Sequence, residues 1–428
     1  MKIPEILLIE SEHRPGNLGQ ILTVIGEYGL TVEHLTMVHR EGGKSVWEVT
    51  LEMDAEADRG VFDKIDALPT AKVLGRSDRV FNRHAGGKIH TVSRVNIESQ
   101  QVLRDIYTPG VARVCLAIQD DPARAYDWTN LGHTVAIVTN GTAILGLGNI
   151  GPVAGLPVME GKAALFAAFS DITGVPILLD TTDPQEVIRV TAAIAPSFGG
   201  IQLEDIAAPE CFEIEQALVE QLEIPVLHDD QHGTAVVTLA ALLNSCARAG
   251  RRPEDSIVGQ VGLGAAGIGI VRLLQHAGMK KVMGADLNPQ AMERLTAMGG
   301  EASSLEQIMA KADIVVATTG VKGLIRREMV RPGQVILALS NPDPEIEPMA
   351  AMNAGAAFAA DGKGINNVLG FPGLFRGALD ARAKCFTDAM LIAAARTLAN
   401  LAGEHDLVPD PLNRRVHDAV AAAVAAVA

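Results

Sequence analysis

A pattern in the second half of the chain limits its possible folds more than any other feature. An apolar segment, Ile257 to Val261, runs directly into G-L-G-A-A-G, and an apolar helix through Leu274 follows. A second apolar segment, Lys281 to Ala285, then ends at Asp286. The glycines of the pattern are Gly262, Gly264 and Gly267. This order predicts a Rossmann-type dinucleotide-binding unit, because it combines a strand, a glycine turn, a helix and a second strand that ends in an acid.

The acid at the end of the second strand also favours one dinucleotide over another. Asp286 is placed to accept hydrogen bonds from the adenosine ribose hydroxyls, and its charge would repel the 2′-phosphate of NADP. Leu287 and Asn288 add no cation that would offset this repulsion. The sequence therefore favours NAD over NADP.

Two pairs of adjacent acids, Glu204-Asp205 and Asp229-Asp230, each follow a short apolar run that reads as a buried strand. The segment between them, residues 209–221, has the apolar spacing of a helix. A strand, helix, strand unit makes the two strands parallel, so both pairs lie at the carboxyl edge of one sheet. Such oxygen ligands suit Mg²⁺ or Mn²⁺. The alternative is that the acids cap helices and solvate loops.

Zinc is a weaker alternative at the same place. His228 and His232 have H-x₃-H spacing, but the acids between them suit a harder ion than Zn²⁺. After them, residues 233–249 read as a helix that crosses into the dinucleotide-binding unit.

Lys162 is a candidate base. A second glycine pattern, Gly146 to Gly151, is followed by Pro152 and Pro157, which we expect to prevent a helix from starting there. We therefore discard it as a dinucleotide site and expect a helix from about Glu160. Lys162 then lies in the first turn, where the helix dipole disfavours a cation and would lower its pKa. A solvated lysine is the alternative.

Three further polar residues lie at predicted turns. Tyr107 precedes a Pro-Gly turn and a new helix, a place where most tyrosines are surface or packing residues. Asn341 follows a predicted strand, residues 335–339, and Asn367 precedes a turn at Phe371-Pro372-Gly373. These amides either set the backbone conformation or face a nicotinamide and a carboxylate.

The first 80 residues predict a separate small domain. Strands at 5–10, 31–38, 46–53 and 71–76 alternate with helices from about 18 and at 59–68, which gives the order βαββαβ of a ferredoxin-like unit. The loop HRPGNLG supplies permissive backbone at Gly16 and a helix cap at Asn17. This order and loop resemble ACT domains, which commonly bind small regulatory ligands. The alternative is an oligomerisation module that binds nothing.

Charge and cysteine content restrict the partners and the compartment. The net charge of −15 argues against nucleic acid and anionic membrane surfaces. Four scattered cysteines without a C-x-x-C pair read as reduced, mostly buried thiols. The amino end lacks the features of a signal peptide, and we expect no membrane span. We therefore expect a cytoplasmic protein.

Six motifs occur together in one order, and as a set they resemble the bacterial malic enzymes from about residue 80 almost to the end. The motifs are YTPGV at 107–111, ILGLGNIGP at 144–152, PVMEGK at 157–162, LEDIAAPECFEIE at 203–215, HDDQHGTA at 228–235 and INNVLGFPG at 365–373. With the ACT-like unit, the resemblance implies an α/β protein of three domains. These are a regulatory domain at 1–80, a substrate domain at 81–235 and a Rossmann domain with C-terminal helices at 236–428.

The resemblance implies oxidative decarboxylation of (S)-malate to pyruvate and CO₂ with NAD or NADP and Mg²⁺ or Mn²⁺, in a homodimer or higher homo-oligomer. Position by position, it implies the following roles: Glu204, Asp205 and Asp230 as metal ligands, Lys162 as the base at the C2 hydroxyl with Asp229 as its partner, Tyr107 as the acid at C3, and Asn341 and Asn367 as contacts to substrate and nicotinamide. One position departs from the larger eukaryotic enzymes, which have an arginine for the substrate carboxylate where this chain has Ala143.

Three other functions remain open from the sequence. A malolactic or oxaloacetate-decarboxylating relative would use the same site and would release lactate or act without net NADH. An amino-acid dehydrogenase would also use a lysine and a Rossmann domain, but would not need metal. A non-catalytic NAD sensor would bind the dinucleotide without turnover.

Overall fold

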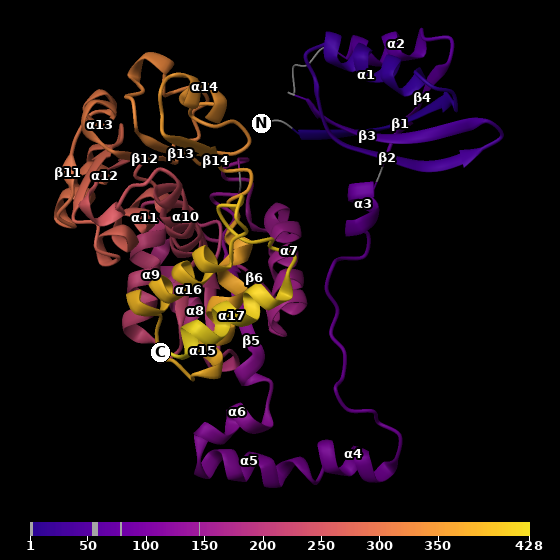
Figure 1. Cartoon of the computed structure of the whole chain (residues 1–428). Helices are drawn as coiled ribbons and strands as arrows, with labels where there is room; N and C mark the ends of the chain where they lie inside the picture. Colours follow the sequence, from indigo (N-terminus) through magenta and orange to yellow (C-terminus); the bar gives the residue numbers. More distant parts are fainter. Residues whose placement is uncertain (1–2, 54–58, 78, 145) are drawn as a thin grey trace. The chain divides into compact units, whose positions relative to one another are not determined.

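The computed structural model describes residues 3–53, 59–77, 79–144 and 146–428, and it divides into two compact units, Met1–Lys88 and Ile89–Ala428 (Figure 1). The polar stretch at residues 78–87, with its Gly86-Gly87 pair, is predicted from the sequence to be a linker, and its first residue, Asp78, lies outside the described residues.

The first unit is an antiparallel sheet with two helices on one face (Figure 1). Its elements are β1 (Ile3–Glu12), α1 (Asn17–Glu27), β2 (Thr31–Glu41), β3 (Lys44–Met53), α2 (Gly60–Asp66), β4 (Ala71–Arg76) and α3 (Arg79–His84). The strand order is β2-β3-β1-β4, and the elements before α3 follow the predicted order βαββαβ. Alternate apolar residues of β1 and β3 pack with Ile21 and Ile25 of α1 and with Val61 and Ile65 of α2.

One local prediction in this unit is wrong, and another is incomplete. Gly16 has a left-handed φ of 91° before α1, as expected, but Asn17 is no cap, because its side chain donates to the carbonyl of Glu12 instead. The stretch after Asp78 is not only a linker, because it contains α3. Arg79 begins that helix with an ion pair to Glu48 in β3, which ties it to the sheet.

The second unit begins with short helices and a parallel sheet. The elements are α4 (Gln100–Ile106), α5 (Val111–Asp120), η1 (Pro122–Arg124), α6 (Ala125–Trp128), η2 (Leu131–His133), β5 (Thr134–Thr139), α7 (Pro152–Ser170), β6 (Thr173–Leu178), α8 (Pro184–Ile194), η3 (Ala195–Ser197), β7 (Gly200–Leu203), α9 (Glu210–Gln221) and β8 (Val226–His228). Strands β5, β7 and β8 are buried, β6 is partly exposed, and the four are parallel in the order β6-β5-β7-β8. The parallel pairing of β7 with β8 is the one that the sequence predicts.

A long helix, α10 (Asp229–Arg248), leads into a second parallel sheet of order β11-β10-β9-β12-β13-β14. The elements are η4 (Pro253–Asp255), β9 (Ile257–Val261), α11 (Ala265–His276), β10 (Lys281–Ala285), α12 (Pro289–Ala297), β11 (Glu301–Ala302), α13 (Leu305–Lys311), β12 (Ile314–Ala317), η5 (Arg327–Met329), β13 (Val335–Ala338), α14 (Pro348–Asn353) and β14 (Phe358–Asp361). Strands β9 and β10 have the predicted bounds. This part is Rossmann-type.

The chain ends with η6 (Asn367–Leu369), α15 (Phe371–Asp380), α16 (Asp388–Leu401) and α17 (Arg414–Ala425). Helices α15 and α17 pack against α7, and α16 packs against α10. The rings of Phe371 and Phe375 meet Phe166 of α7 edge to face, at 4.9 and 5.5 Å between centroids. The carboxyl end of the chain therefore covers the first sheet layer as well as following the second.

Three helices begin earlier than predicted. Helix α7 begins at Pro152 rather than near Glu160, because a proline is well tolerated at the first helical position, where its missing N–H is not needed. Helix α10 begins at Asp229 rather than Gly233, so both acids lie in its first turn. The turn expected at Phe371-Pro372-Gly373 is the first turn of α15 for the same reason as in α7.

One bulk prediction also changes. The four cysteines are free, but only Cys211 and Cys246 are buried, while Cys115 and Cys385 are exposed. Among the described residues, α7 alone is long and apolar enough to pass a membrane-span test by length and composition. It contains Glu160 and Lys162 and packs against β6, α15 and α17, as a core helix does.

Candidate active site

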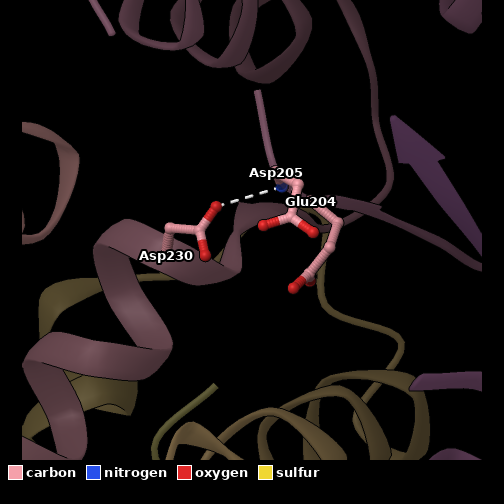
Figure 2. A group of neighbouring side chains, drawn as sticks. All are labelled: Glu204, Asp205 and Asp230. Atoms are coloured by element: carbon pink, nitrogen blue, oxygen red, sulfur yellow. Dashed lines mark hydrogen bonds between the residues drawn. The ribbon is translucent and has the colours of Figure 1, made fainter. Parts of the chain in front are cut away.

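The carboxylates of Glu204, Asp205 and Asp230 lie together at one edge of the first parallel sheet (Figure 2). Glu204 and Asp205 directly follow β7, and Asp230 lies in the turn of α10 that directly follows the neighbouring strand β8. One oxygen from each residue lies within 4.8 Å of the other two. The structure thus brings together the three residues that we expect to be metal ligands.

Backbone contacts hold this cluster. The N–H of Asp205 donates to Asp230 Oδ2 at 3.0 Å, the bond drawn in Figure 2. Its carbonyl accepts the N–H of Ala143 at 3.0 Å, which ties the loop before α7 to the site. Asp205 adopts a left-handed φ of 52°, a conformation that costs a non-glycine residue on the order of 1–3 kcal/mol. The surrounding hydrogen bonds offset that cost.

Lys162 lies in the middle of α7 and points its buried amino group at the acids. Its Nζ lies 3.0 Å from Glu204 Oε1 and donates to Asp229 Oδ2. The ring of Phe371 lies 4.4 Å away and shields the ammonium from water on that side. The structure therefore brings Lys162 together with Asp229, as the sequence expects, but from the helix interior.

The cluster carries more negative than positive charge. The ammonium of Lys162 pairs with Glu204 and Asp229, and the carboxylates of Asp205 and Asp230 lie next to that of Glu204. Burial, which outweighs the attraction of Lys162, raises the pKa of Glu204 and of Asp229. Such a donor set fits a hard divalent cation, because the cation would replace lost hydration and neutralise the excess charge.

The prediction that the pKa of Lys162 is lowered is wrong for the protein side chains without a bound cation. Burial favours the neutral amine, but the charges of Asp229 and Glu204 outweigh it and raise the pKa of Lys162 above its ordinary value. The helix-dipole argument also fails, because Lys162 is not in the first turn of α7.

Asn367 and Asn341 take different positions. Asn367 Nδ2 donates to Asp229 Oδ2 at 2.8 Å, so it belongs to the lysine and aspartate pair. Asn341 Nδ2 donates to the carbonyl of Gly362 at 3.2 Å, between the ends of β13 and β14. Only Asn367 is joined to the acidic cluster by a described hydrogen bond.

Tyr107 is not brought to the cluster. It ends α4 with 69% of its surface exposed, and no described contact joins its side chain to Lys162. Helices α4 and α5 contain no buried residue, and α4 packs against α5.

The two histidines do not form a zinc pair. His232 Nε2 bonds to Glu215 at 3.0 Å, whereas buried His228 lies with Nε2 3.7 Å from Asp230 Oδ2. The metal-ligand group found among the described residues here contains carboxylates only.

The glycine turn after β9 has the geometry of a dinucleotide site. Gly262 has φ 89°, and a Cβ there would lie 2.7 Å from the carbonyl of Thr318. A Cβ at Gly267 would lie 2.0 Å from the carbonyl of Gly262, so this glycine lets α11 pack closely. A Cβ at Gly264 would meet only open space, where a pyrophosphate would approach the helix N-terminus.

Asp286 is fixed beside this turn. Its Oδ2 accepts the N–H of Leu263 at 2.7 Å, and its Oδ1 accepts the N–H of Asn288 at 2.8 Å. The carboxylate is thus held at the end of β10, next to the glycines, with lone pairs left for ribose hydroxyls.

Three buried residues of the site were missed from the sequence. Gln202 donates to Glu204 Oε2 at 2.6 Å, because residues two apart on β7 share a face. Glu345 accepts from Thr319 N at 2.6 Å and from Ser340 Oγ at 2.5 Å, joining the turns after β12 and β13. Glu215 bonds to the start of α10. Strand alternation could have indicated Gln202, whereas the other two contacts have no sequence signal.

Comparisons with known protein families match three segments of the chain. Residues 86–219 match the malic enzyme N-terminal domain, and residues 348–428 match the malic enzyme NAD-binding domain. Residues 231–329 match the NAD-binding domain of D-isomer specific 2-hydroxyacid dehydrogenases.

Individual proteins are similar over most of the chain. The NAD-dependent malic enzyme 1 of Bacillus subtilis is 52% identical over 98% of this chain and 96% of its own length. The bifunctional malic/malolactic enzyme of the same organism is 42% identical over 79% of this chain and 89% of its own. The crystal structure of the malic enzyme from Pyrococcus horikoshii superimposes with a TM-score of 0.78 and 40% identity, covering 82% of this chain and 89% of that one.

Proposed function

This chain belongs to the malic enzyme family and acts as an NAD-dependent malic enzyme, and we propose that Glu204, Asp205 and Asp230 hold its divalent metal ion. The single observation that carries the proposal is the position of Lys162 Nζ, 3.0 Å from Glu204 and hydrogen-bonded to Asp229. Lys162, as the base, and the metal ion held by the carboxylates would then act on neighbouring atoms of malate.

When bound, Mg²⁺ or Mn²⁺ would polarise the C2 oxygen and the adjacent carboxylate of malate and accept charge as CO₂ leaves. Lys162 takes the proton from the C2 hydroxyl as hydride leaves C2 for NAD. For this step Lys162 must be neutral. The charges of Asp229 and Glu204 raise the pKa of the lysine, and a cation bound at Glu204 would oppose them and favour the neutral amine, which Asp229 would orient.

The Rossmann-type part supplies the cofactor site. The turn of Gly262, Gly264 and Gly267 would take the pyrophosphate, and Asp286 would bind the ribose hydroxyls and disfavour NADP. Asn341, which follows β13 and donates to the carbonyl of Gly362, would contact the nicotinamide.

We propose that Tyr107 protonates C3 of the enol from a second copy of the chain. Helices α4 and α5 leave Leu103, Ile106 and Leu116 exposed beside Tyr107, an apolar set that a homodimer would cover. Mixing Tyr107→Phe with Lys162→Met tests this. Each variant alone is expected to convert malate to pyruvate about 10²–10⁴-fold more slowly, and a hybrid dimer that regains this turnover supports it. No recovery after verified subunit exchange would contradict it.

The first unit would serve as an ACT-like regulatory domain. Its βαββαβ order and its antiparallel sheet are compatible with this role, and a small ligand, often an amino acid in ACT domains, would bind there. We further propose that the enzyme is cytoplasmic.

Turnover of malate with NAD or NADP, with and without Mn²⁺, is the experiment that tests the whole proposal. Pyruvate, CO₂ and NADH in equal amounts, dependent on Mn²⁺, are expected. Lactate without net NADH would instead indicate a malolactic enzyme. Full activity in EDTA would overturn the metal site.

A further inference from the structure

Glu215 is a buried carboxylate that the proposed mechanism does not use. It lies on α9, where Glu210, Glu213 and Glu220 face solvent, yet Glu215 is only 8% exposed. Burying a carboxylate costs several kcal/mol unless donors replace the lost water. Its contacts therefore show what the burial achieves.

All three donors to Glu215 belong to the start of α10. The N–H of His228 donates to Oε1 at 2.7 Å, Gln231 Nε2 donates to Oε2 at 3.0 Å, and His232 Nε2 lies 3.0 Å from Oε2. Burial alone would raise the pKa of Glu215, but the neighbouring His232 and His228 and these bonds hold the pKa below its ordinary value. Bonds to an ionised carboxylate are stronger than those between neutral groups.

The three donors bracket the two acids of the site in sequence. His228 precedes Asp229 and Asp230, and Gln231 and His232 follow them. The carboxylate of Glu215, which lies on a separate helix, thus holds both ends of the segment that contains Asp229 and Asp230. Within that segment, Asp230 bonds to Asp205 and Asp229 bonds to Lys162. A movement of this turn would separate Asp230 from the other carboxylates.

We infer that Glu215 is a positioning residue that presets the first turn of α10 for metal binding, an inference that rests on the metal site proposed above. Its role differs from that of an ordinary packing contact, because it determines the position of a ligand rather than the stability of the fold alone. Partners of metal ligands typically contribute about 10–100-fold to metal affinity.

Mn²⁺ binding, followed by electron paramagnetic resonance, tests the inference without relying on turnover. Glu215→Gln removes the charge and keeps the volume, and Glu220→Gln on the exposed face of the same helix is the matched control. We expect the Mn²⁺ dissociation constant to rise about 10–100-fold in Glu215→Gln and to stay unchanged in Glu220→Gln. NAD affinity should be the same in both, because no described hydrogen bond joins Glu215 to the glycine turn.

An unchanged Mn²⁺ dissociation constant in Glu215→Gln with intact NAD binding would overturn the inference. If that variant does not fold, Gln231→Met and His232→Phe each remove one donor, and unchanged Mn²⁺ affinity in both would also overturn it. Asp230→Asn separates the two proposals. If Asp230→Asn binds Mn²⁺ as tightly as the unaltered protein does, the proposed metal site is wrong. If it does not bind Mn²⁺, the metal site stands, and the Mn²⁺ affinities of the Glu215, Gln231 and His232 variants decide the role of Glu215.

Discussion

The side-chain amide of Asn367 donates a hydrogen bond of 2.8 Å to Asp229, a residue 138 positions earlier in the chain. The same oxygen, Asp229 Oδ2, also accepts a hydrogen bond from Lys162 Nζ. The other oxygen, Oδ1, is buried without a hydrogen-bond partner among the described residues. Gly233 makes room for that second oxygen, since a Cβ there would lie 1.9 Å from it. Asn367 therefore fixes the aspartate that orients the lysine.

Asn367→Ala should lower kcat by about 10–100-fold, because a hydrogen bond to a charged group contributes roughly 1.5–3 kcal/mol. KM for NAD should stay within about twofold, since the amide bonds to Asp229. Steady-state kinetics checks both, with Asn366→Ala as the neighbouring control. A raised KM for NAD at unchanged kcat would place Asn367 at the nicotinamide instead.

Lys162→Met should reduce malate oxidation by about 10²–10⁴-fold, the usual contribution of a positioned base. The same variant should bind Mn²⁺ at least as tightly as the unaltered protein, because the ammonium that competes for Glu204 is gone. Stopped-flow NADH formation and Mn²⁺ resonance measure the two effects. Loss of Mn²⁺ binding would mean that Lys162 holds the site together rather than acting on the substrate.

Asp286→Ser should lower kcat/KM for NAD by about 10-fold, as expected for one lost hydrogen bond to a charged acceptor, and should raise the relative use of NADP. Serine can still accept a backbone N–H from the glycine turn. Glu293→Ser, an exposed acid on α12, is the control. An equal loss with both cofactors would show that Asp286 only holds the turn.

His417 should make the fold sensitive to acid. Its Nε2–H donates to the carbonyl of Pro411 at 2.8 Å, whereas Nδ1 is buried without a described partner, and burial lowers its pKa. The folded state thus binds the proton less well than the unfolded state. The free energy of unfolding should therefore be highest above about pH 6.5, and it should fall as the pH drops through the pKa of His417 in the folded state.

Urea unfolding between pH 5 and 8 measures this effect. His417→Gln keeps a donor for Pro411 and should flatten the acid limb, whereas His405→Gln at an exposed position should leave it as it is. The same acid limb in all three proteins would show that other groups cause the loss.

The sequence determined the parallel strands, the glycine turn and the placement of the acids, because these depend on local patterns. Alternation and apolar runs predicted β7, β9 and β10, and a strand, helix, strand connection places Glu204, Asp205 and Asp230 at one edge. The dinucleotide signature needs only neighbouring residues, so it too could be read directly.

Only the tertiary structure decided the contacts between distant segments and the charge state that they create. The pKa of Lys162 depends on Glu204 and Asp229, which reach it from other elements, so its rise could not be inferred from a helix position. Asn367 acts on α10 from 138 positions away in the chain, and Glu215 acts on it from the separate helix α9. No local pattern encodes such hydrogen bonds, because they arise from packing after the strands and helices have formed.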